Sequence, residues 1–465
     1  MTDGKRAVLI VAILASLIAF LDGSIVNVAL PAIERELGGS VQLQQWVVDA
    51  YLLTLGSLIL LAGSFSDRYG RTRILRIGLI GFAVTSLIAA AAPSGELLVA
   101  ARALQGAAAA LLIPSSLAML AATFKGPDLG KAIGSWTAWT GLAFLIGPVA
   151  GGVLVDTLGW RWVFGAILLP TVLALLLSMR VPKGPVPTAA DRPRIDIVGA
   201  VLAAVGLAGP VSALIEGQQL GFTSAFVLTA GIIGLAALVA FVLWERRTPH
   251  PMLPPTLFRL RSFTVANLAT IGVYGAVGLG PVLLTLLLQE VGKLPATVSA
   301  AVTLPIPIFA ILLSRLFGGL SGKYGPRIFM TAGPLISGLG FLYLLSTQEP
   351  LNVWTQVLPG MILFGIGIAM TASPLTATVL SEIPDGEAGI ASAVNNAVAR
   401  VSGLVSVAFI SLILGGTISI EGFHRGVITI AGLLTASALV AFVGLRSSSS
   451  KSVRPRKSRI SSTLS

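Results

Sequence analysis

The sequence predicts an all-α polytopic membrane protein, and three observations carry that prediction. The chain has 465 residues, of which 55% are hydrophobic and only 11% are charged, with a mean hydropathy of +0.92. A soluble domain has about 25% charged residues, so this chain needs lipid as well as water around it. Its apolar residues fall in long runs that can cross a hydrocarbon core of ~30 Å as helices. Membrane β-barrels show short alternating segments instead, which favours a helical bundle.

Fourteen apolar runs are long enough to span the bilayer. Their approximate cores are residues 7–30, 43–65, 74–92, 97–121, 132–155, 162–180, 196–215, 224–244, 264–288, 297–317, 327–346, 353–379, 389–414 and 427–445. The first run is too long for the core of a signal peptide and has no A-x-A site at its end, so we expect it to be the first membrane helix.

Positive charge is divided unevenly between the two sets of connecting loops. With the N-terminus inside, most Lys and Arg residues lie in cytoplasmic loops or in the C-terminal tail. The external loops hold only Arg35, Arg161, Lys293 and Arg425. This asymmetry follows the positive-inside rule, so we expect an even number of helices and both termini in the cytoplasm.

The connecting segments divide the helices into six, two and six. Residues 181–196 and 245–262 are rich in Pro and charge and are typical of linkers. The predicted units are a six-helix bundle at 1–180, linkers with two inserted helices at 181–262, a second six-helix bundle at 263–445 and a basic, disordered cytoplasmic tail at 446–465.

A loop pattern occurs once in each six-helix half. Residues 63–71 read GSFSDRYGR and residues 318–327 read GGLSGKYGPR, each at the end of the second helix of its half. Two halves related by a repeat are typical of transporters that bind substrate between them.

The first copy resembles the signature loop of the major facilitator superfamily, G-x-x-x-D-R-x-G-R-[KR]. The resemblance implies a cytoplasmic gating loop formed by Gly63, Asp67, Arg68, Gly70 and Arg71. Gly63 would allow close helix packing and Gly70 a tight turn. Asp67 would meet an Arg or a helix N-terminus. A plain basic turn is the alternative, and the second copy has Gly322 in place of the acid.

Two further motifs resemble those of the drug:proton antiporter family with fourteen transmembrane helices (EmrB/QacA-like). The antiporter motif of the fifth helix comprises Gly141, Gly147, Pro148, Gly151 and Gly152. Pro148 would kink the helix and the glycines would allow close packing; ordinary small-residue packing is the alternative. Residues 21–31, LDGSIVNVALP, resemble the first-helix signature. The resemblance implies a major facilitator fold in a bacterial cytoplasmic (inner) membrane.

Ionisable groups inside the membrane are costly without a partner and often functional. The candidates for proton or substrate coupling are Asp22, Asp49, Arg102, Gln105 and Glu216. Asp22 lies near mid-membrane and is the first candidate for a proton site, because burial favours the protonated form of a carboxyl group. A structural hydrogen bond to a neighbouring helix is the alternative.

Asp49 and Arg102 lie at the same depth, roughly 9 Å inside the outer boundary at ~1.5 Å per residue. Asp49 resembles an acid of family members that export cationic drugs, but it could equally be an ion-pair partner of Arg102. Arg102 and Gln105 resemble a fourth-helix motif linked to proton transfer. Because an Arg does not deprotonate, Arg102 would act by changing the pKa of a nearby acid. Glu216 is either an interfacial acid or a site residue.

Further polar residues on the first and thirteenth helices either stabilise the bundle or line a cavity. They are Asn27, Asn395, Asn396 and Arg400.

Several classes of chemistry are excluded. The chain has no Cys and no G-x-x-x-x-G-K-[ST] motif, and its two His have no partner at ligand spacing, so we expect no enzyme activity, metal site, cofactor or nucleotide. The distribution of the +12 charge argues against nucleic acid.

The resemblance implies a proton-coupled antiporter that exports hydrophobic or amphipathic, cationic drug-like compounds by alternating access. Its expected partners are the lipid bilayer, protons and a small substrate, and it is expected to be a monomer. The alternatives are an exporter of one endogenous lipid, metabolite or antibiotic, or a membrane sensor or scaffold without transport.

Overall fold

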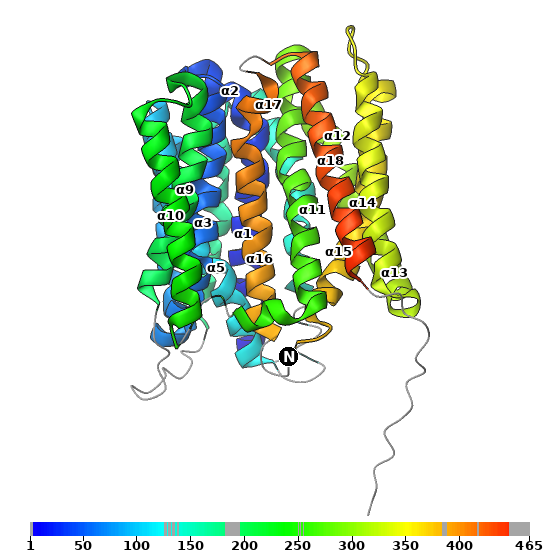
Figure 1. Ribbon diagram of the computed structural model, residues 1–465. Coiled ribbons are helices and arrows are strands. Elements are labelled where there is room, and N and C mark those ends of the chain that lie inside the picture. Colours follow the sequence, from blue (N-terminus) through cyan, green and yellow to red (C-terminus); the bar gives the residue numbers. More distant parts are fainter. Residues whose placement is uncertain are drawn as a thin grey trace, which may run out of the picture.

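The computed structural model describes residues 3–124, 139–181, 196–249, 255–383, 388–415 and 418–445, with six single residues between these ranges. Throughout these residues the fold is helical, and the helices stand side by side along one axis (Figure 1). We call the end of the bundle at which the chain begins the N-side and the opposite end the far side. Residues 182–195 of the expected linker at 181–196, and the tail at 446–465, lie outside the described residues.

The first group of helices packs around α5. It comprises α1 (Asp3–Ile25), the 3-10 turn η1 (Val26–Ala29), α2 (Leu30–Leu37), α3 (Val41–Tyr69), α4 (Arg71–Ala90), α5 (Gly95–Thr123), α7 (Ala143–Thr157) and α8 (Arg161–Ser178). α5 contacts α1, α3 and α4, and α1 also contacts α7 and α8. The buried face of α5 is rich in Ala, and such small side chains let helix backbones approach closely in a membrane.

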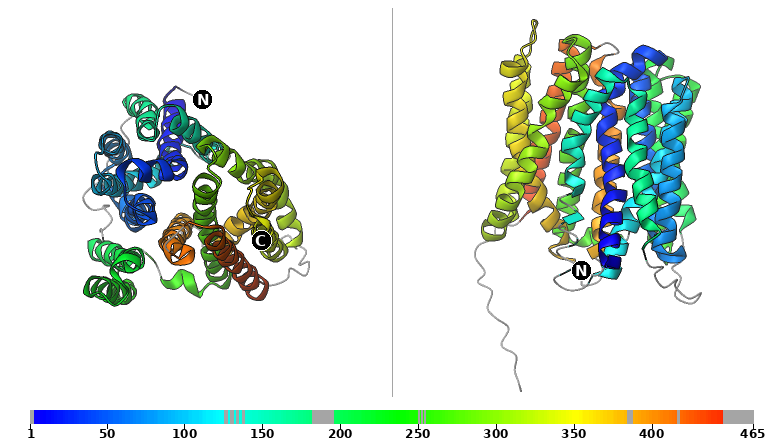
Figure 2. Two further views of the ribbon diagram at one scale, coloured as in Figure 1. Left: turned by 90° about the horizontal axis from the view of Figure 1, so that it is seen from above. Right: turned by 180° about the vertical axis from the view of Figure 1, so that it is seen from behind.

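The two inserted helices, α9 (Ile197–Leu220) and α10 (Ala225–Arg247), form a hairpin at one edge of the bundle (Figure 2). Asp196 caps the start of α9 by accepting a hydrogen bond from the amide of Gly199 at 2.8 Å, and it also accepts one from Trp244 Nε1 at 2.8 Å. α9 contacts α3 of the first group and α16 of the second. The hairpin therefore touches both halves.

The second group follows the same plan. It comprises the 3-10 turn η3 (Pro255–Arg259), α11 (Arg261–Leu286), the π-helical turn η4 (Leu287–Val291), α12 (Ala296–Thr303), α13 (Pro305–Tyr324), α14 (Pro326–Tyr343), η5 (Leu344–Ser346), the π-helical turn η6 (Val353–Val357), α15 (Leu358–Leu380), α16 (Ala388–Ala408), α17 (Ile410–Leu414) and α18 (Ile420–Gly444). α11 contacts α15, α16 and α18. The expected tenth helix is divided into α12 and α13 at Leu304, where Pro305 has no amide hydrogen to continue the helical bonding.

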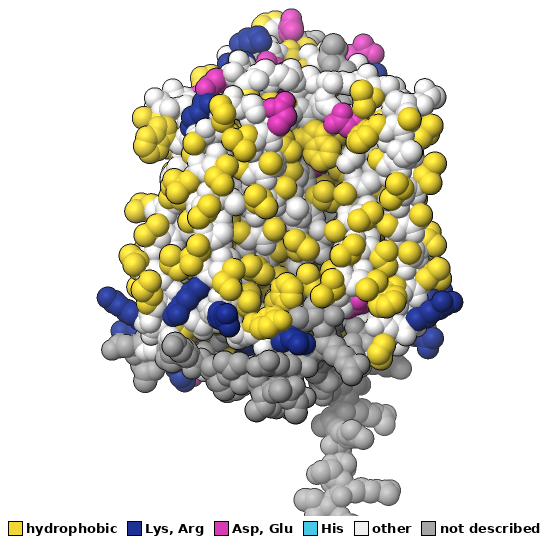
Figure 3. Space-filling model, turned by 90° about the vertical axis from the view of Figure 1, so that its left-hand side faces the viewer, with side chains coloured by type: hydrophobic (Ala, Val, Ile, Leu, Met, Phe, Trp, Pro, Cys, Tyr) yellow, Lys and Arg dark blue, Asp and Glu magenta, His cyan; other side chains and the backbone are white. Residues whose placement is uncertain are grey.

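The predicted polytopic class is confirmed. Within the described residues, thirteen helices are long and apolar enough to cross a membrane, and α3, with 29 residues, matches them in length. Together they correspond to the fourteen predicted runs. On the face shown in Figure 3, hydrophobic side chains cover the middle, and Lys and Arg side chains gather near the N-side edge.

The repeated loop has the same backbone geometry in both halves. Gly70 ends α3 with φ of 96° and its amide donates to the carbonyl of Ser66 at 3.1 Å. Gly325 ends α13 with φ of 86° and its amide donates to the carbonyl of Ser321 at 2.8 Å. Because positive φ strains residues with a Cβ, both tight turns depend on glycine.

Candidate functional site

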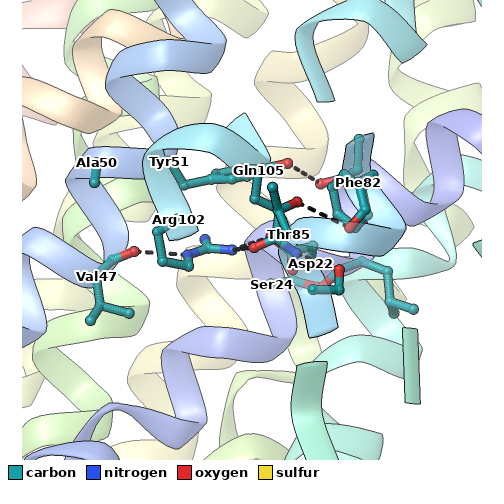
Figure 4. A network of polar contacts seen from close by, with 12 residues as sticks. Asp22, Ser24, Val47, Ala50, Tyr51, Phe82, Thr85, Arg102 and Gln105 are labelled. Carbon is teal, nitrogen blue, oxygen red and sulfur yellow. Dashed lines mark hydrogen bonds and ion pairs between the residues drawn. The ribbon is translucent and has the colours of Figure 1, made fainter. Parts of the chain in front are cut away.

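A polar network lies inside the first group of helices and links α1 to α5 (Figure 4). Arg102 Nη1 lies 2.5 Å from Asp22 Oδ2 and 2.7 Å from Gln105 Oε1. Gln105 Nε2 donates to Asp22 Oδ1 at 3.2 Å and to Ser86 Oγ at 2.8 Å. Asp22, Arg102 and Gln105 are 0%, 1% and 0% exposed. Their charges and dipoles therefore act on one another without screening by water.

α3 completes the network from the other side of Arg102. Arg102 Nε donates to the carbonyl of Val47 at 2.9 Å, and its guanidinium lies 4.3 Å from the centre of the Tyr51 ring. This approach of α3 to α5 depends on Gly106, because a Cβ there would lie 2.2 Å from the carbonyl oxygen of Tyr51 and from Thr54 Oγ1. The local packing thus fixes the guanidinium beside Asp22.

In this arrangement one of the two charged groups can take up a proton. A guanidinium stays charged in proteins, whereas a carboxyl group can take up a proton and become neutral. Protonation of Asp22 would remove the charge that holds Arg102 and would weaken the bond between α1 and α5. The expected hydrogen bond of Asp22 to a neighbouring helix is therefore present.

Asp49 lies on a different face of α3. Its side chain is 0% exposed, and neither carboxyl oxygen has a hydrogen-bond partner among the residues that the structure describes. Its helical neighbours Gln45 and Trp46 reach α16 and α9, so Asp49 points to the junction of α3, α9 and α16. The expected alternative of an Asp49–Arg102 ion pair is not formed in this structure, because Arg102 is bound to Asp22.

Glu216 lies on the inserted helix α9 and is half-buried. Its Oε1 accepts a hydrogen bond from Trp46 Nε1 of α3 at 2.8 Å. Gln219, one turn further on, donates to Ser40 Oγ at 3.2 Å. Both bonds tie the hairpin to the first group of helices, and Glu216 does not join the network around Asp22.

The two halves are joined by hydrogen bonds at the far side. Asp156 of α7 accepts from the amides of Ala296 and Thr297 at 3.1 and 2.9 Å, and from Thr297 Oγ1 at 2.6 Å. Gln289 Nε2 donates to the carbonyl of Val28 at 3.1 Å.

A third far-side contact joins α3 to α16 and α17. Gln45 Nε2 donates to the carbonyls of Val407 and Ala408 at 3.1 and 3.0 Å, and Ser411 Oγ donates to Gln45 Oε1. With the contacts of Asp156 and Gln289, it joins the two halves at the far side. Sequence reasoning missed all three residues; the only signal was their polarity at or near the ends of apolar runs.

The glycines of α7 have different surroundings. A Cβ at Gly147 would lie 2.1 Å from Ser24 Oγ, and one at Gly151 would lie 2.7 Å from Ile25 Cγ1, so both require α1 to be close. A Cβ at Gly152 would lie 2.6 Å from the Cα of Thr297 in the other half. Pro148 lies between them within α7.

Two residues of the expected motifs have looser surroundings. A Cβ added at Gly141 would meet no described residue within 4 Å, and one at Gly63 would make an ordinary contact with Pro114 at 3.9 Å. The close packing predicted for Gly63 is therefore not required in this conformation.

The gating loop is described in part. Arg71 Nη1 donates to the carbonyl of Ala118 in α5 at 3.0 Å. The guanidinium of Arg68 lies 5.7 Å from the centre of the Tyr69 ring. The side chain of Asp67 lies outside the described part of the structure, so its predicted partner stays a prediction.

The remaining polar candidates do not form one group. Asn395 Nδ2 donates to Asn267 Oδ1 and Thr270 Oγ1 at 3.1 and 2.8 Å, which stabilises the second half. Asn396 is exposed, and Asn27 and Arg400 are half-buried. The described residues contain no group of three or more potential metal ligands.

Comparisons with known proteins give a consistent result. The sequence pattern of the Major Facilitator Superfamily matches residues 12–199 and 194–407. The puromycin resistance protein pur8 of Streptomyces alboniger is 33% identical over 94% of this chain and 90% of its own length. The multidrug resistance protein Stp of Mycobacterium tuberculosis (strain CDC 1551 / Oshkosh) is 34% identical over 86% of this chain and 74% of its own.

The fold is also found among solved structures. The inward-open xylose transporter XylE from E. coli superposes with a TM-score of 0.65 at 16% identity, covering 96% of this chain and 98% of its own.

Proposed function

The chain belongs to the major facilitator superfamily, and on that basis we propose that it is a proton-coupled exporter (antiporter) of hydrophobic or amphipathic drug-like compounds. It is a multi-pass membrane transporter and not an enzyme. The drug-resistance names of its relatives support the substrate class. The observation that carries the proposal is the buried network of Asp22, Arg102 and Gln105, which places one titratable carboxyl group beside a fixed positive charge.

Helix packing provides a route from this network to the other half. Ser24, two residues from Asp22, donates to the carbonyl of Ala143 at 3.1 Å and so links α1 to α7. α7 in turn contacts α12 of the second half at Gly152 and Asp156. In the proposed cycle, protonation of Asp22 frees α1 to shift, and α7 transmits that shift to the contacts that close the far side.

The proposed orientation places the N-side, with both termini, in the cytoplasm of a bacterial cell. The basic residues gathered near that edge (Figure 3) support it through the positive-inside rule. Protons then enter from the far side and substrate leaves there. The transporter acts as a monomer in this proposal.

Selection of cationic compounds would require Asp22 or Asp49 to reach the substrate. In this conformation both are fully buried, and Asp22 is already neutralised by Arg102. In this proposal, the protein therefore selects substrates by their positive charge only in a conformation that exposes Asp49.

The test is proton-driven uptake of a lipophilic dye into inverted vesicles. We expect Asp22→Asn to abolish uptake driven by a pH gradient and to retain exchange of dye without a gradient, because exchange needs no net proton movement. Retained exchange also shows that the variant is folded. Glu421→Gln, an exposed acid at the start of α18, is the matched control. Gradient-driven uptake by Asp22→Asn at the wild-type rate would contradict the proposal.

A second candidate is the export of one particular antibiotic. It is favoured by the extent of the match to the puromycin resistance protein, which spans nearly both chains. Uptake of several unrelated dyes at similar rates would exclude it, whereas uptake of puromycin alone would support it.

A further inference from the structure

An aromatic cluster lies between the two halves at the middle of the bundle. Phe20 of α1 contacts Trp136 and Phe144, with ring centres 6.4 and 5.8 Å away. Arg400 of α16, in the other half, places its guanidinium 4.9 Å from the centre of the Phe20 ring. Its Cβ lies 3.7 Å from where a Cβ on Gly56 of α3 would stand. Arg400 thus passes α3 and reaches α1.

Arg400 differs from the other arginine at the middle of the bundle. Arg102 is bound by Asp22, Gln105 and the Val47 carbonyl. Arg400 has no hydrogen bond and no carboxylate within ion-pair distance among the described residues. A charged group within a membrane bundle costs several kcal/mol without a partner, and a cation–π contact returns only about 0.5–2 kcal/mol of that. Half-buried Arg400 is therefore available to a ligand.

A second donor of the same cluster is also unsatisfied. The indole nitrogen of Trp136 is buried and has no acceptor within the described part of the chain, although a buried indole N–H usually finds one. Guanidinium and indole N–H groups only donate hydrogen bonds. Arg400 and Trp136 therefore both offer unused hydrogen-bond donors, and Arg400 also carries a positive charge.

We infer that Phe20, Trp136 and Arg400 form a substrate site for an aromatic compound that carries an anionic oxygen, such as a carboxylate or a phenolate. The rings of Phe20 and Trp136 pack against the aromatic part. Arg400 and the Trp136 N–H bind the oxygen. The inference rests on the proposed export function, and it names a substrate charge opposite to the one that the buried acids would select.

The test compares three ligands that share one ring system and differ in charge. They are 2-naphthoate, 2-naphthylmethanol and 2-naphthylmethylamine, each titrated by calorimetry into the full-length protein in nanodiscs. We expect the anion to bind at least tenfold more tightly than the cation, which corresponds to about 1.4 kcal/mol, with the neutral alcohol between them. Equal or tighter binding of the cation by the wild-type protein would overturn the inference without any variant.

Two variants then assign the effect to its residues. Arg400→Gln should weaken binding of the anion at least tenfold and change that of the alcohol less than threefold, whereas Arg400→Lys should keep part of the preference for the anion. Trp136→Phe keeps a ring, removes the donor and should weaken the anion by a smaller factor. Arg315→Gln, at an exposed position of α13, is the matched control. An unchanged Kd of the anion in Arg400→Gln would also overturn the inference.

These titrations need no proton gradient, so they separate the inference from the proposed function. Preference for the anion without gradient-driven transport would leave the site standing and refute antiport. Gradient-driven export with preference for the cation would support antiport and refute the site.

Discussion

The ion pair of Asp22 and Arg102 makes an asymmetric prediction about stability. Asp22→Asn leaves the guanidinium buried without a counter-charge, and removing one partner of a buried ion pair costs about 3–5 kcal/mol. Arg102→Gln leaves a carboxyl group that can take up a proton and that still accepts from Gln105. We expect its cost to be about 1–3 kcal/mol, the range for an unsatisfied buried polar group.

The double variant Asp22→Asn, Arg102→Gln completes the cycle. It contains no buried charge at this position, so it should be more stable than Asp22→Asn alone. For residues in contact the coupling energy is about 0.5–3 kcal/mol. The assay is the free energy of unfolding, or the order of unfolding midpoints, measured at pH 7 in one detergent for the wild-type protein and the three variants.

Two results would refute this reasoning. One is an Asp22→Asn variant that is no less stable than Arg102→Gln, which would show that the guanidinium is not held by the carboxylate. The other is a double variant whose loss equals the sum of the single losses, which would show that the two residues do not interact.

Three further predictions concern other parts of the bundle. Gly106→Val should prevent accumulation of folded protein, because its first side-chain carbon would lie 2.2 Å from α3. The measurement is the folded yield by size-exclusion chromatography, with Gly141→Ala as the control. A normal folded yield would contradict the close packing of α3 on Gly106. Asp156→Ala removes three hydrogen bonds to α12. It should therefore increase the rate at which a reagent added from the far side labels a thiol introduced by Val298→Cys, and this labelling is specific because the chain has no other Cys. An unchanged rate would show that Asp156 does not hold the two halves together at the far side. Glu216→Gln should lower stability by about 1 kcal/mol and leave the proton dependence of dye uptake unaltered, whereas a shifted proton dependence would make Glu216 a coupling residue.

The membrane helices could be predicted from the sequence because each one is specified locally. Hydropathy over about 20 residues is enough to find a span. The six, two and six division, which was inferred from the composition of the linkers, stays a prediction. The turn at Gly70 was also predictable, since its backbone angle is a local property. The π-helical turns and the division at Leu304 were not predicted, because they interrupt helices whose composition is continuous.

The partner of Arg102 shows where local information ends. Depth alone left Asp49 as a possible partner, because both residues lie at the same level in the membrane. Helical rotation of about 100° per residue decides the matter once one contact on α3 is known. Arg102 touches Val47 and Tyr51, and Asp49 is two residues, or about 200°, away from Val47. It therefore points to the opposite face, and only the packing of α3 shows which face meets α5.

The contacts of the inserted hairpin have a mechanical consequence for the seam between α3 and α16. α9 is hydrogen-bonded to the α3 side through Glu216 and Gln219, but it meets α16 through the apolar side chains of Val211 and Ile215 against Leu404 and Ala408. When the halves separate, lipid tails can replace those apolar contacts at almost no change in free energy. We therefore expect the hairpin to move together with the first half. Resistance to opening along this seam then comes from the side-chain amide of Gln45. Lipid tails cannot replace the hydrogen bonds that this amide donates to α16.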